Sequence, residues 1–176
     1  AIGHVQEVLF LRSMLKRYDA LPTGQLVESG QRAVAAHLQR QGIDATVQPG
    51  MLPGSYRVRY ASPAQPLVSI IIPTKDKAPL LQRCLETLTS RTDYRNYEVL
   101  VVDSGSTEGD AIALLDQLIG LESPSLRVYR YPGEFHFGRI NNLVAQEAQG
   151  ELVLFLNNDT APLNADWLDE MVGLIS

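Results

Sequence analysis

Cysteine and tryptophan are scarce in this sequence of 176 residues, and acidic residues outnumber basic ones. The single cysteine, Cys84, excludes an internal disulfide and a metal site built from several thiolates, and it fits a reducing compartment. Lys and Arg total 15 against 20 Asp and Glu, and the formal net charge of −5 argues against a general nucleic-acid binder. No apolar run reaches the roughly 18 residues that a membrane span needs. We also find no basic region followed by an apolar core and a small-residue cleavage site, so we expect no signal peptide.

The composition and length are those of a globular domain with a small appendage. Hydrophobic residues make up 45% of the chain, which is enough for a proper core. The stretch ASPAQP, residues 61–66, has the composition of a linker. We therefore expect a small α+β region over residues 1–62, the end of an upstream segment, and a larger domain over residues 67–176. Because the sequence starts at Ala1 without Met and stops at Ser176 inside an apolar helical pattern, we expect it to be part of a longer protein.

The first region shows helix and strand patterns without a catalytic constellation. Residues 5–18 form one possible helix. A second helix is predicted from Thr23, as its N-cap, to Gly42, as its C′ residue. Short strands are predicted at residues 43–47 and 55–60. We interpret this region as packing, or as a connection to an upstream segment.

From Leu67 onward, apolar runs alternate with helical patterns. The runs are continuous, as in parallel strands that are buried on both faces. Such alternation predicts an open, mostly parallel α/β sheet that is covered by helices and joined by right-handed crossovers. The strands are predicted at residues 67–72, 97–102, 126–131 and 151–156. The apolar helix faces are predicted at Leu81, Cys84, Leu85 and Leu88, at Ile112, Leu115 and Ile119, at Ile140, Val144 and Ala148 before Gly150, and, after an Asn164 cap, at Leu168, Val172 and Ile175.

Oxygen-rich residues follow three of the predicted strands. In open parallel sheets, ligands bind outside the carboxyl ends of the strands, so three aspartates would share one rim. Each has a simpler interpretation, as the cap of the next helix for Asp76 and as ordinary turn residues for Asp103 and Asp159. Converging carboxylates repel one another unless a cation lies among them, and a divalent cation with a phosphate-bearing ligand meets that requirement. The three stretches are Pro73-Thr74-Lys75-Asp76, Asp103-Ser104-Gly105-Ser106 and Asn157-Asn158-Asp159.

The segments PLVSIIIPTKD, YEVLVVDSGST and INNLVAQEAQGELVLFLNNDT resemble the opening half of family 2 glycosyltransferases over residues 66–176. The resemblance implies a GT-A (Rossmann-like) fold, truncated here to its nucleotide-diphospho-sugar-binding half. It also implies transfer of a sugar, with inversion, from a nucleotide-diphosphate sugar to a polysaccharide or lipid-linked acceptor. The run LNNDT is similar to members that build bacterial surface polysaccharides, including rhamnosyltransferase-like ones.

The same resemblance assigns roles to the rim residues. Asp159 would hold Mg²⁺ or Mn²⁺, which acts as a Lewis acid on the leaving diphosphate. Asn157 replaces the first acid of the family's DxD-type motif, so it keeps an acceptor but loses a charge. By the residues alone, Arg139 is more simply a surface arginine, and His136 lacks a partner histidine and is interpreted as structural or surface. The implied nucleotide-binding residues are Pro73, Thr74, Lys75, Asp76, Asp103, Arg139, Asn142, Asn157 and Asn158.

Departures from the family pattern keep a second interpretation open. Ser104 stands where many relatives have an acid, and the general base and the acceptor-binding half would lie beyond Ser176. The chain would then hold the donor site alone and would not turn over by itself. The alternative is a catalytically inactive GT-A-like scaffold or a nucleotide-binding regulatory module, whereas a dinucleotide oxidoreductase is disfavoured because PTKD offers no glycine. The resemblance places a hexosyltransferase of this kind in the bacterial cytoplasm, either free or at the inner face of the plasma membrane.

Overall fold

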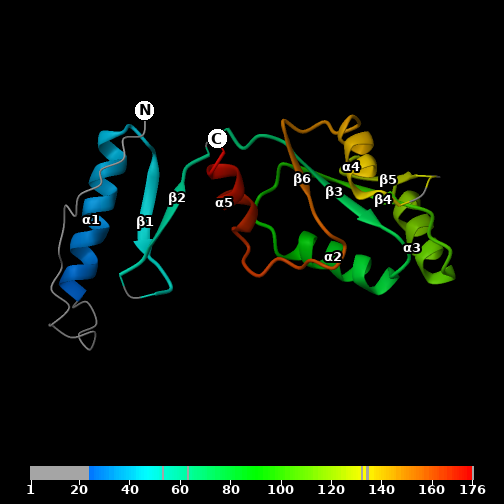
Figure 1. Cartoon of the computed structure of the whole chain (residues 1–176), viewed down its shortest axis with the longest axis horizontal. Coiled ribbons are helices and arrows are strands. Elements are labelled where there is room, and N and C mark those ends of the chain that lie inside the picture. The colour runs from blue at the N-terminus through cyan, green and yellow to red at the C-terminus, as the bar shows by residue number, and fades with distance from the viewer. Residues whose placement is uncertain (1–23, 53, 63, 132, 134, 176) are drawn as a thin grey trace, which may run out of the picture. The chain divides into compact units, whose positions relative to one another are not determined.

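The computed structural model describes most of the chain, as two units: Ala1–Ala61 and Ser62–Ser176. Figure 1 labels the helices and strands of both units. The possible helix at residues 5–18 and the predicted cap at Thr23 lie outside the described residues. The described residues are 24–52, 54–62, 64–131, 133 and 135–175.

The first unit is a helix on an antiparallel hairpin. Helix α1 (Gly24–Arg40) packs against β1 (Ala45–Pro49), and β1 pairs with β2 (Tyr56–Tyr60). The Tyr56 hydroxyl donates a hydrogen bond to the Val27 carbonyl oxygen at 3.0 Å and so ties the second strand to the helix. The predicted helix and both predicted strands of this region are confirmed, with slightly different bounds.

The second unit is built on four strands, β3 (Val68–Thr74), β4 (Tyr97–Asp103), β5 (Leu126–Arg130) and β6 (Leu152–Phe155). Their order across the sheet is β5-β4-β3-β6. All three pairings are parallel, which confirms the predicted open α/β sheet. Parallel strands end at one edge, so the segments that follow β3, β4 and β6 leave the sheet on the same side.

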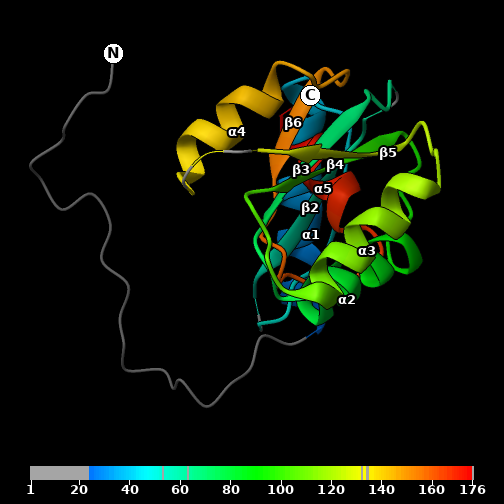
Figure 2. The same ribbon diagram turned by 90° about the vertical axis from the view of Figure 1, so that its right-hand side faces the viewer.

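Helices cover both faces of this sheet, as a parallel sheet requires. They are α2 (Ala78–Ser90), α3 (Gly109–Gly120), α4 (Phe137–Ala145) and α5 (Trp167–Gly173). Figure 2 shows α4 on one side of the sheet and α2 and α3 on the other. No helix in the described part of the chain has the length and apolar character needed to cross a membrane.

The central strand β3 supplies apolar side chains to both faces. Ile70 and Ile72 join a cluster with Leu81 of α2, whereas Ile71 joins a second cluster with Ile140 of α4. The three isoleucines of β3 are fully buried. Burying each side chain of this size stabilises the fold by roughly 1.5–3 kcal/mol, so the continuous apolar run anchors the sheet.

The buried face of α3 differs from the prediction. Ile112 and Ile119 are 37% and 47% exposed, and the helix instead buries Ala111, Leu115 and Leu118. The predicted face was wrong at its two isoleucines because this helix is apolar around most of its circumference. Periodicity alone then leaves more than one face that could meet the sheet.

The last two helices also end differently from the prediction. Helix α4 ends at Ala145, before the predicted end at Gly150. In α5 the N-cap is Asp166 rather than Asn164, and Ile175 lies past the end of the helix, 66% exposed. The buried positions predicted inside these helices, Ile140, Val144, Leu168 and Val172, are confirmed, whereas helix ends are harder to predict from sequence.

A buried carboxylate ties together the amino-terminal ends of three strands. Glu98 of β4, 3% exposed, accepts hydrogen bonds from Ser69 Oγ of β3 at 2.6 Å and from Arg127 Nη2 of β5 at 2.6 Å. It also accepts the Gln149 backbone N–H at 2.7 Å, and the Gly150 N–H donates to Ser69 Oγ at 2.8 Å. The segment that leads into β6 is therefore held to the sheet before β6 begins.

Candidate functional site

Three loops meet at the carboxyl edge of the sheet. Thr74 and Asp103 are the last pair in the β3–β4 register. The Ser104 backbone N–H and hydroxyl both donate to the Thr74 carbonyl oxygen, each at 3.0 Å, so the first two loops are joined where they begin. The loops are named the β3 loop (residues 73–77), the β4 loop (residues 103–108) and the β6 loop (residues 157–160).

Asp76 joins the β3 loop to the start of α3. Its φ is 54° and that of Lys77 is 56°, a left-handed conformation that residues with a Cβ seldom adopt. Asp76 Oδ1 accepts the backbone N–H groups of Thr107 at 2.7 Å and of Glu108 at 2.8 Å. The bonds from Glu108 and Thr107 lower the pKa of the Asp76 carboxyl. Asp76 therefore binds the turn that precedes α3. The N-cap of the following helix α2 is Lys77, and not Asp76 as the simplest interpretation from sequence held.

Asp103 is the buried carboxylate of the rim. It is 6% exposed, and its Oδ1 accepts the Ser106 N–H at 2.9 Å in a turn that Gly105, at φ 83°, permits. Ser106 Oγ in turn accepts the Asp76 N–H at 2.7 Å. No role for Ser106 was predicted from the sequence. The signal for one was a serine three positions after an aspartate, which is typical of side-chain to backbone bonding in turns.

The β6 loop turns back over the β3 loop. The Thr160 N–H donates to the Asn157 carbonyl oxygen at 3.2 Å, which closes a tight turn. Asn158 points inward, and its Nδ2 donates to Thr74 Oγ1 at 3.0 Å. Asn157 and Asp159, on either side of it, are exposed. The structure therefore brings predicted site residues from all three loops together at one rim.

Cys84 of α2 lies beneath the β6 loop. Its Sγ is 3.7 Å from the Asn157 carbonyl oxygen, and the residue is 1% exposed. Burial raises the pKa of the Cys84 thiol, and the nearby negative charge of Asp159 raises it further. The prediction that Cys84 belongs to the core is confirmed, and the structure adds a contact to the rim that the sequence did not reveal.

The site residues predicted on α4 stand apart from this hydrogen-bonded rim. Arg139 and Asn142 are exposed, and among the described residues no hydrogen bond or ion pair links their side chains to the three loops. His136 is the N-cap, and its Nδ1 accepts the Arg139 N–H at 3.3 Å. Asn141 is 3% exposed, and neither Oδ1 nor Nδ2 has a hydrogen-bond partner in the described part of the chain.

The rim offers few ligands for a metal ion. Within the described ranges, no group of three or more His, Cys, Asp or Glu side chains is placed to hold one. Asp159 supplies one exposed carboxylate and Asn157 an amide oxygen. These are hard oxygen donors of the kind that Mg²⁺ and Mn²⁺ accept, and Mg²⁺ commonly completes its shell with water and substrate phosphate. The residues therefore fit an ion that arrives together with a diphosphate.

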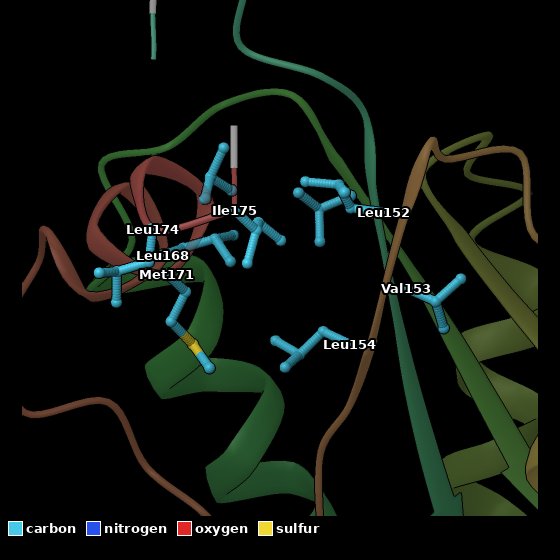
Figure 3. Close-up of a pocket in the computed structure, with 9 residues that line it drawn as sticks. Leu152, Val153, Leu154, Leu168, Met171, Leu174 and Ile175 are labelled. Carbon is cyan, nitrogen blue, oxygen red and sulfur yellow. The ribbon is translucent and has the colours of Figure 1, made fainter. Parts of the chain in front are cut away.

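A separate apolar cavity of about 290 Å³ lies between β6 and α5. In Figure 3, Leu152 and Leu154 of β6 point toward Leu168 and Met171 of α5. All nine lining residues are apolar, and none belongs to the three loops. The cavity suits apolar packing and not the binding of a charged nucleotide.

A parallel sheet with hydrogen-bonded, oxygen-rich loops at its carboxyl edge is the arrangement in which open α/β domains bind their ligands. The sequence model described as Glycosyl transferase family 2 matches residues 69–176. The chain belongs to this family, as its three quoted segments led us to expect.

Relatives and solved structures agree with this membership. The O-antigen biosynthesis protein RfbC of Myxococcus xanthus is 39% identical over 178 residues, covering 98% of this chain and 14% of that protein. The mannosyltransferase PcManGT of Pyrobaculum calidifontis, in complex with GDP-Man and Mn²⁺, matches with a TM-score of 0.59 at 21% identity, covering 85% of this chain and 41% of that one. TarS of S. aureus, in complex with UDP-GlcNAc, matches with a TM-score of 0.50 at 25% identity, covering 61% and 30%.

These matches confirm the predicted GT-A fold. The chain spans only 14% of the RfbC protein and less than half of each of the two solved structures.

Proposed function

We propose that this chain is the donor-binding half of an inverting glycosyltransferase. Its substrate would be a nucleotide-diphosphate sugar, and the hexosyl group would pass to a glycan or lipid-linked acceptor. The observation that carries the proposal is the hydrogen bond between Asn158 Nδ2 and Thr74 Oγ1, because it brings the loop of the implied metal residue to the loop of the implied nucleoside residues. The UDP-GlcNAc bound in the TarS structure and the O-antigen role in the name of RfbC support the substrate class.

The nucleoside is assigned to the β3 and β4 loops. The Asp103 carboxylate accepts hydrogen bonds from a base N–H or a ribose hydroxyl, and the backbone at Pro73 and Thr74 faces the base edge. Lys75 is exposed at the same rim and meets the base or a phosphate through its stem or its ammonium group. The Asp76 carboxylate accepts N–H groups of the turn before α3 and so holds the β3 loop to the β4 loop.

The diphosphate is assigned to the β6 loop and to α4. Asp159 and the amide oxygen of Asn157 would hold Mg²⁺ or Mn²⁺ there. The family resemblance assigns Arg139 and Asn142, two exposed side chains of α4, to the phosphates. When bound, the ion supplies Lewis-acid stabilisation of the charge that develops on the leaving diphosphate. Asp159 is the one carboxylate of this loop, so the ion also needs diphosphate oxygens as ligands. Nucleotide and metal should therefore bind together and not independently.

Transfer with inversion is a single displacement at the anomeric carbon. The bond from the acceptor oxygen to that carbon forms while the bond from the carbon to the phosphate oxygen breaks, and the electron pair leaves with the nucleoside diphosphate. The acceptor proton passes to a general base. We place that base and the acceptor site outside these 176 residues, so the chain alone should bind donor without turning it over.

Calorimetric titration of UDP, dTDP and GDP, each with and without Mn²⁺, tests the proposal. We expect one of these to bind the 176-residue chain more tightly with Mn²⁺, and Asp159→Ala to reduce that enhancement about tenfold or more. Asp93→Ala is the matched control, since it removes another exposed carboxylate, ahead of β4 and at the other end of the strands. A wild-type chain that binds none of the three nucleotides, with or without the ion, contradicts the proposal.

A second candidate is a catalytically inactive scaffold or a nucleotide-binding regulatory module. Asn157 and Ser104, in places where many family members carry acids, favour it. It predicts either no nucleotide affinity in a folded chain or affinity that Mn²⁺ leaves unchanged, so the same titration separates the two candidates.

A further inference from the structure

The β6 loop leaves the sheet before its neighbour does. Strand β6 pairs with β3 only as far as Ile71 and Phe155, and one more backbone bond, from the Leu156 N–H to the Ile71 carbonyl oxygen, follows at 2.9 Å. Strand β3 continues beside β4 to Thr74. The position of the β6 loop is therefore not determined by sheet pairing beyond Leu156, and side-chain contacts must determine it.

Two contacts hold the loop from different elements. On the β3 side, Asn158 Nδ2 donates to Thr74 Oγ1 at 3.0 Å across 84 positions of sequence. On the α2 side, Cys84 Sγ lies 3.7 Å from the Asn157 carbonyl oxygen. A thiol is a weak donor, and at this distance Cys84 supports the loop mainly by packing against it. The amide-to-hydroxyl bond is the directional contact, and Thr74, at 3% exposure, is shielded from competing water.

This bond sets which side chains of the loop face the ligand. With the Asn158 amide directed inward to Thr74, its neighbours Asn157 and Asp159 are directed outward and are exposed. Thr74 is itself held by Ser104, which donates twice to the Thr74 carbonyl oxygen. The same residue therefore contacts the β4 loop through its backbone and the β6 loop through its side chain.

We propose that the hydrogen bond between Asn158 and Thr74 couples the nucleoside pocket to Asp159. Asn158 is then a positioning residue that orients Asp159, and not a ligand of the nucleotide. The proposal deepens the proposed function and rests on it. It predicts that removing the bond weakens the coupling between Mn²⁺ and nucleotide more than it weakens metal-free nucleotide affinity.

Thr74→Val removes the hydroxyl and keeps the shape, and Asn158→Ala removes the amide. For each we expect the Mn²⁺-dependent gain in nucleotide affinity to fall about three- to tenfold, the loss expected of one neutral hydrogen bond. Affinity without metal should fall by a smaller factor than the Mn²⁺-dependent gain does, because each mutation removes a side-chain contact within the protein and leaves the Thr74 backbone in place. The double variant should lose no more than either single variant, since the two share one interaction. Thr74→Ser should recover most of the gain, and Thr89→Val, on the exposed surface of α2, should change nothing.

A second readout needs neither metal nor nucleotide. In NMR spectra of the free chain, the Asn158 side-chain NH₂ protons should exchange slowly with solvent in the wild type and in Thr74→Ser, and rapidly in Thr74→Val.

Equal losses of affinity with and without Mn²⁺ would mean that these residues contact the nucleotide directly, which overturns the coupling. Additive losses in the double variant also overturn it. A wild-type chain without metal-enhanced binding overturns the proposed function as well, so the two failures are distinguishable.

Discussion

The Asp76 carboxylate accepts the backbone N–H of Thr107 at 2.7 Å, across 31 positions of sequence. It also accepts the Glu108 N–H at 2.8 Å, and the N-cap residue Glu108 makes no side-chain cap bond of its own. These N–H groups belong to the N-cap residue of α3 and to the residue before it. A carboxylate near the positive end of a helix is stabilising, and here it comes from a different loop. The start of α3 and the shape of the β3 loop therefore depend on each other.

Asp76→Ala should lower the midpoint of thermal unfolding, because it leaves two N–H groups at the start of α3 without their acceptor. Asp76→Asn keeps an acceptor and should lower it less. Since backbone bonds from Glu108 and Thr107 lower the pKa of Asp76 from 3.8, its contribution should be complete above that pH and should vanish as pH falls through the lowered native pKa. Thermal scans by circular dichroism from pH 7 to strongly acidic pH measure this, with Asp93→Asn as the control. Identical acid profiles for the wild type and Asp76→Asn contradict the assignment.

The buried Glu98 gives a second pH prediction. Burial works to raise the pKa of this carboxyl, but hydrogen bonds from Ser69, the Gln149 N–H and Arg127 outweigh it and lower the pKa below 4.5. The stability it contributes should be complete above pH 4.5 and should be lost as pH falls through the native pKa. Glu98→Gln should flatten that part of the acid profile in urea unfolding.

Removing the whole Glu98 side chain should cost more. Glu98→Ala leaves Arg127, whose side chain is 28% exposed, without its carboxylate partner. We expect a loss of about 2–4 kcal/mol in the free energy of unfolding, at or below the range for breaking a fully buried pair. Urea unfolding at pH 7 measures it, and Glu86→Ala on the exposed face of α2 serves as the control. If Glu98→Ala loses no more free energy of unfolding than the control does, the ion pair does not stabilise the fold.

Gly150 marks a place where two backbones come close. A Cβ there would lie 2.6 Å from the Leu67 carbonyl oxygen and 2.7 Å from the Ser69 backbone nitrogen. Gly150→Ala should destabilise the chain by about 1–3 kcal/mol, since backbone atoms cannot move aside as a flexible side chain would. Gly109→Ala, in the first turn of α3, meets nothing within 4 Å and should be neutral or stabilising by up to about 1 kcal/mol. Chemical denaturation measures the free energy of unfolding of both variants. A loss for Gly150→Ala without a loss for Gly109→Ala supports the close approach at Gly150, and equal changes contradict it.

Strand β6 carries apolar side chains on a partly open surface. Among the described residues it pairs with β3 alone, and Val153 and Phe155 are 42% and 47% exposed. Exposed apolar edge strands promote association. Phe155→Lys should therefore reduce self-association of the chain in light scattering at high concentration, with unchanged far-UV circular dichroism. Leu163→Lys, at an exposed leucine outside β6, tests whether any added charge has the same effect.

The sequence predicted the order and type of the elements, because continuous apolar runs such as the one at Ile70–Ile72 can be satisfied only by burial on both faces. It also predicted that Asp103 and the Asn157–Asp159 stretch would share an edge, since carboxyl ends of parallel strands coincide. The family membership followed from the same motifs. What remains a prediction is the role of each residue toward nucleotide and metal.

Only the tertiary structure decided which residue meets which. That Asp76 binds the turn before α3, that Asn158 turns inward to Thr74, and that α3 buries Leu118 and not Ile119 all depend on partners 30 or more positions away or on the rotation of a helix. Periodicity records how apolar a segment is on each side, but a helix apolar on several sides has no unique face. Hydrogen-bond partners depend on the order of strands across the sheet and on where each strand ends, and these are properties of the packed chain and not of any local stretch of sequence.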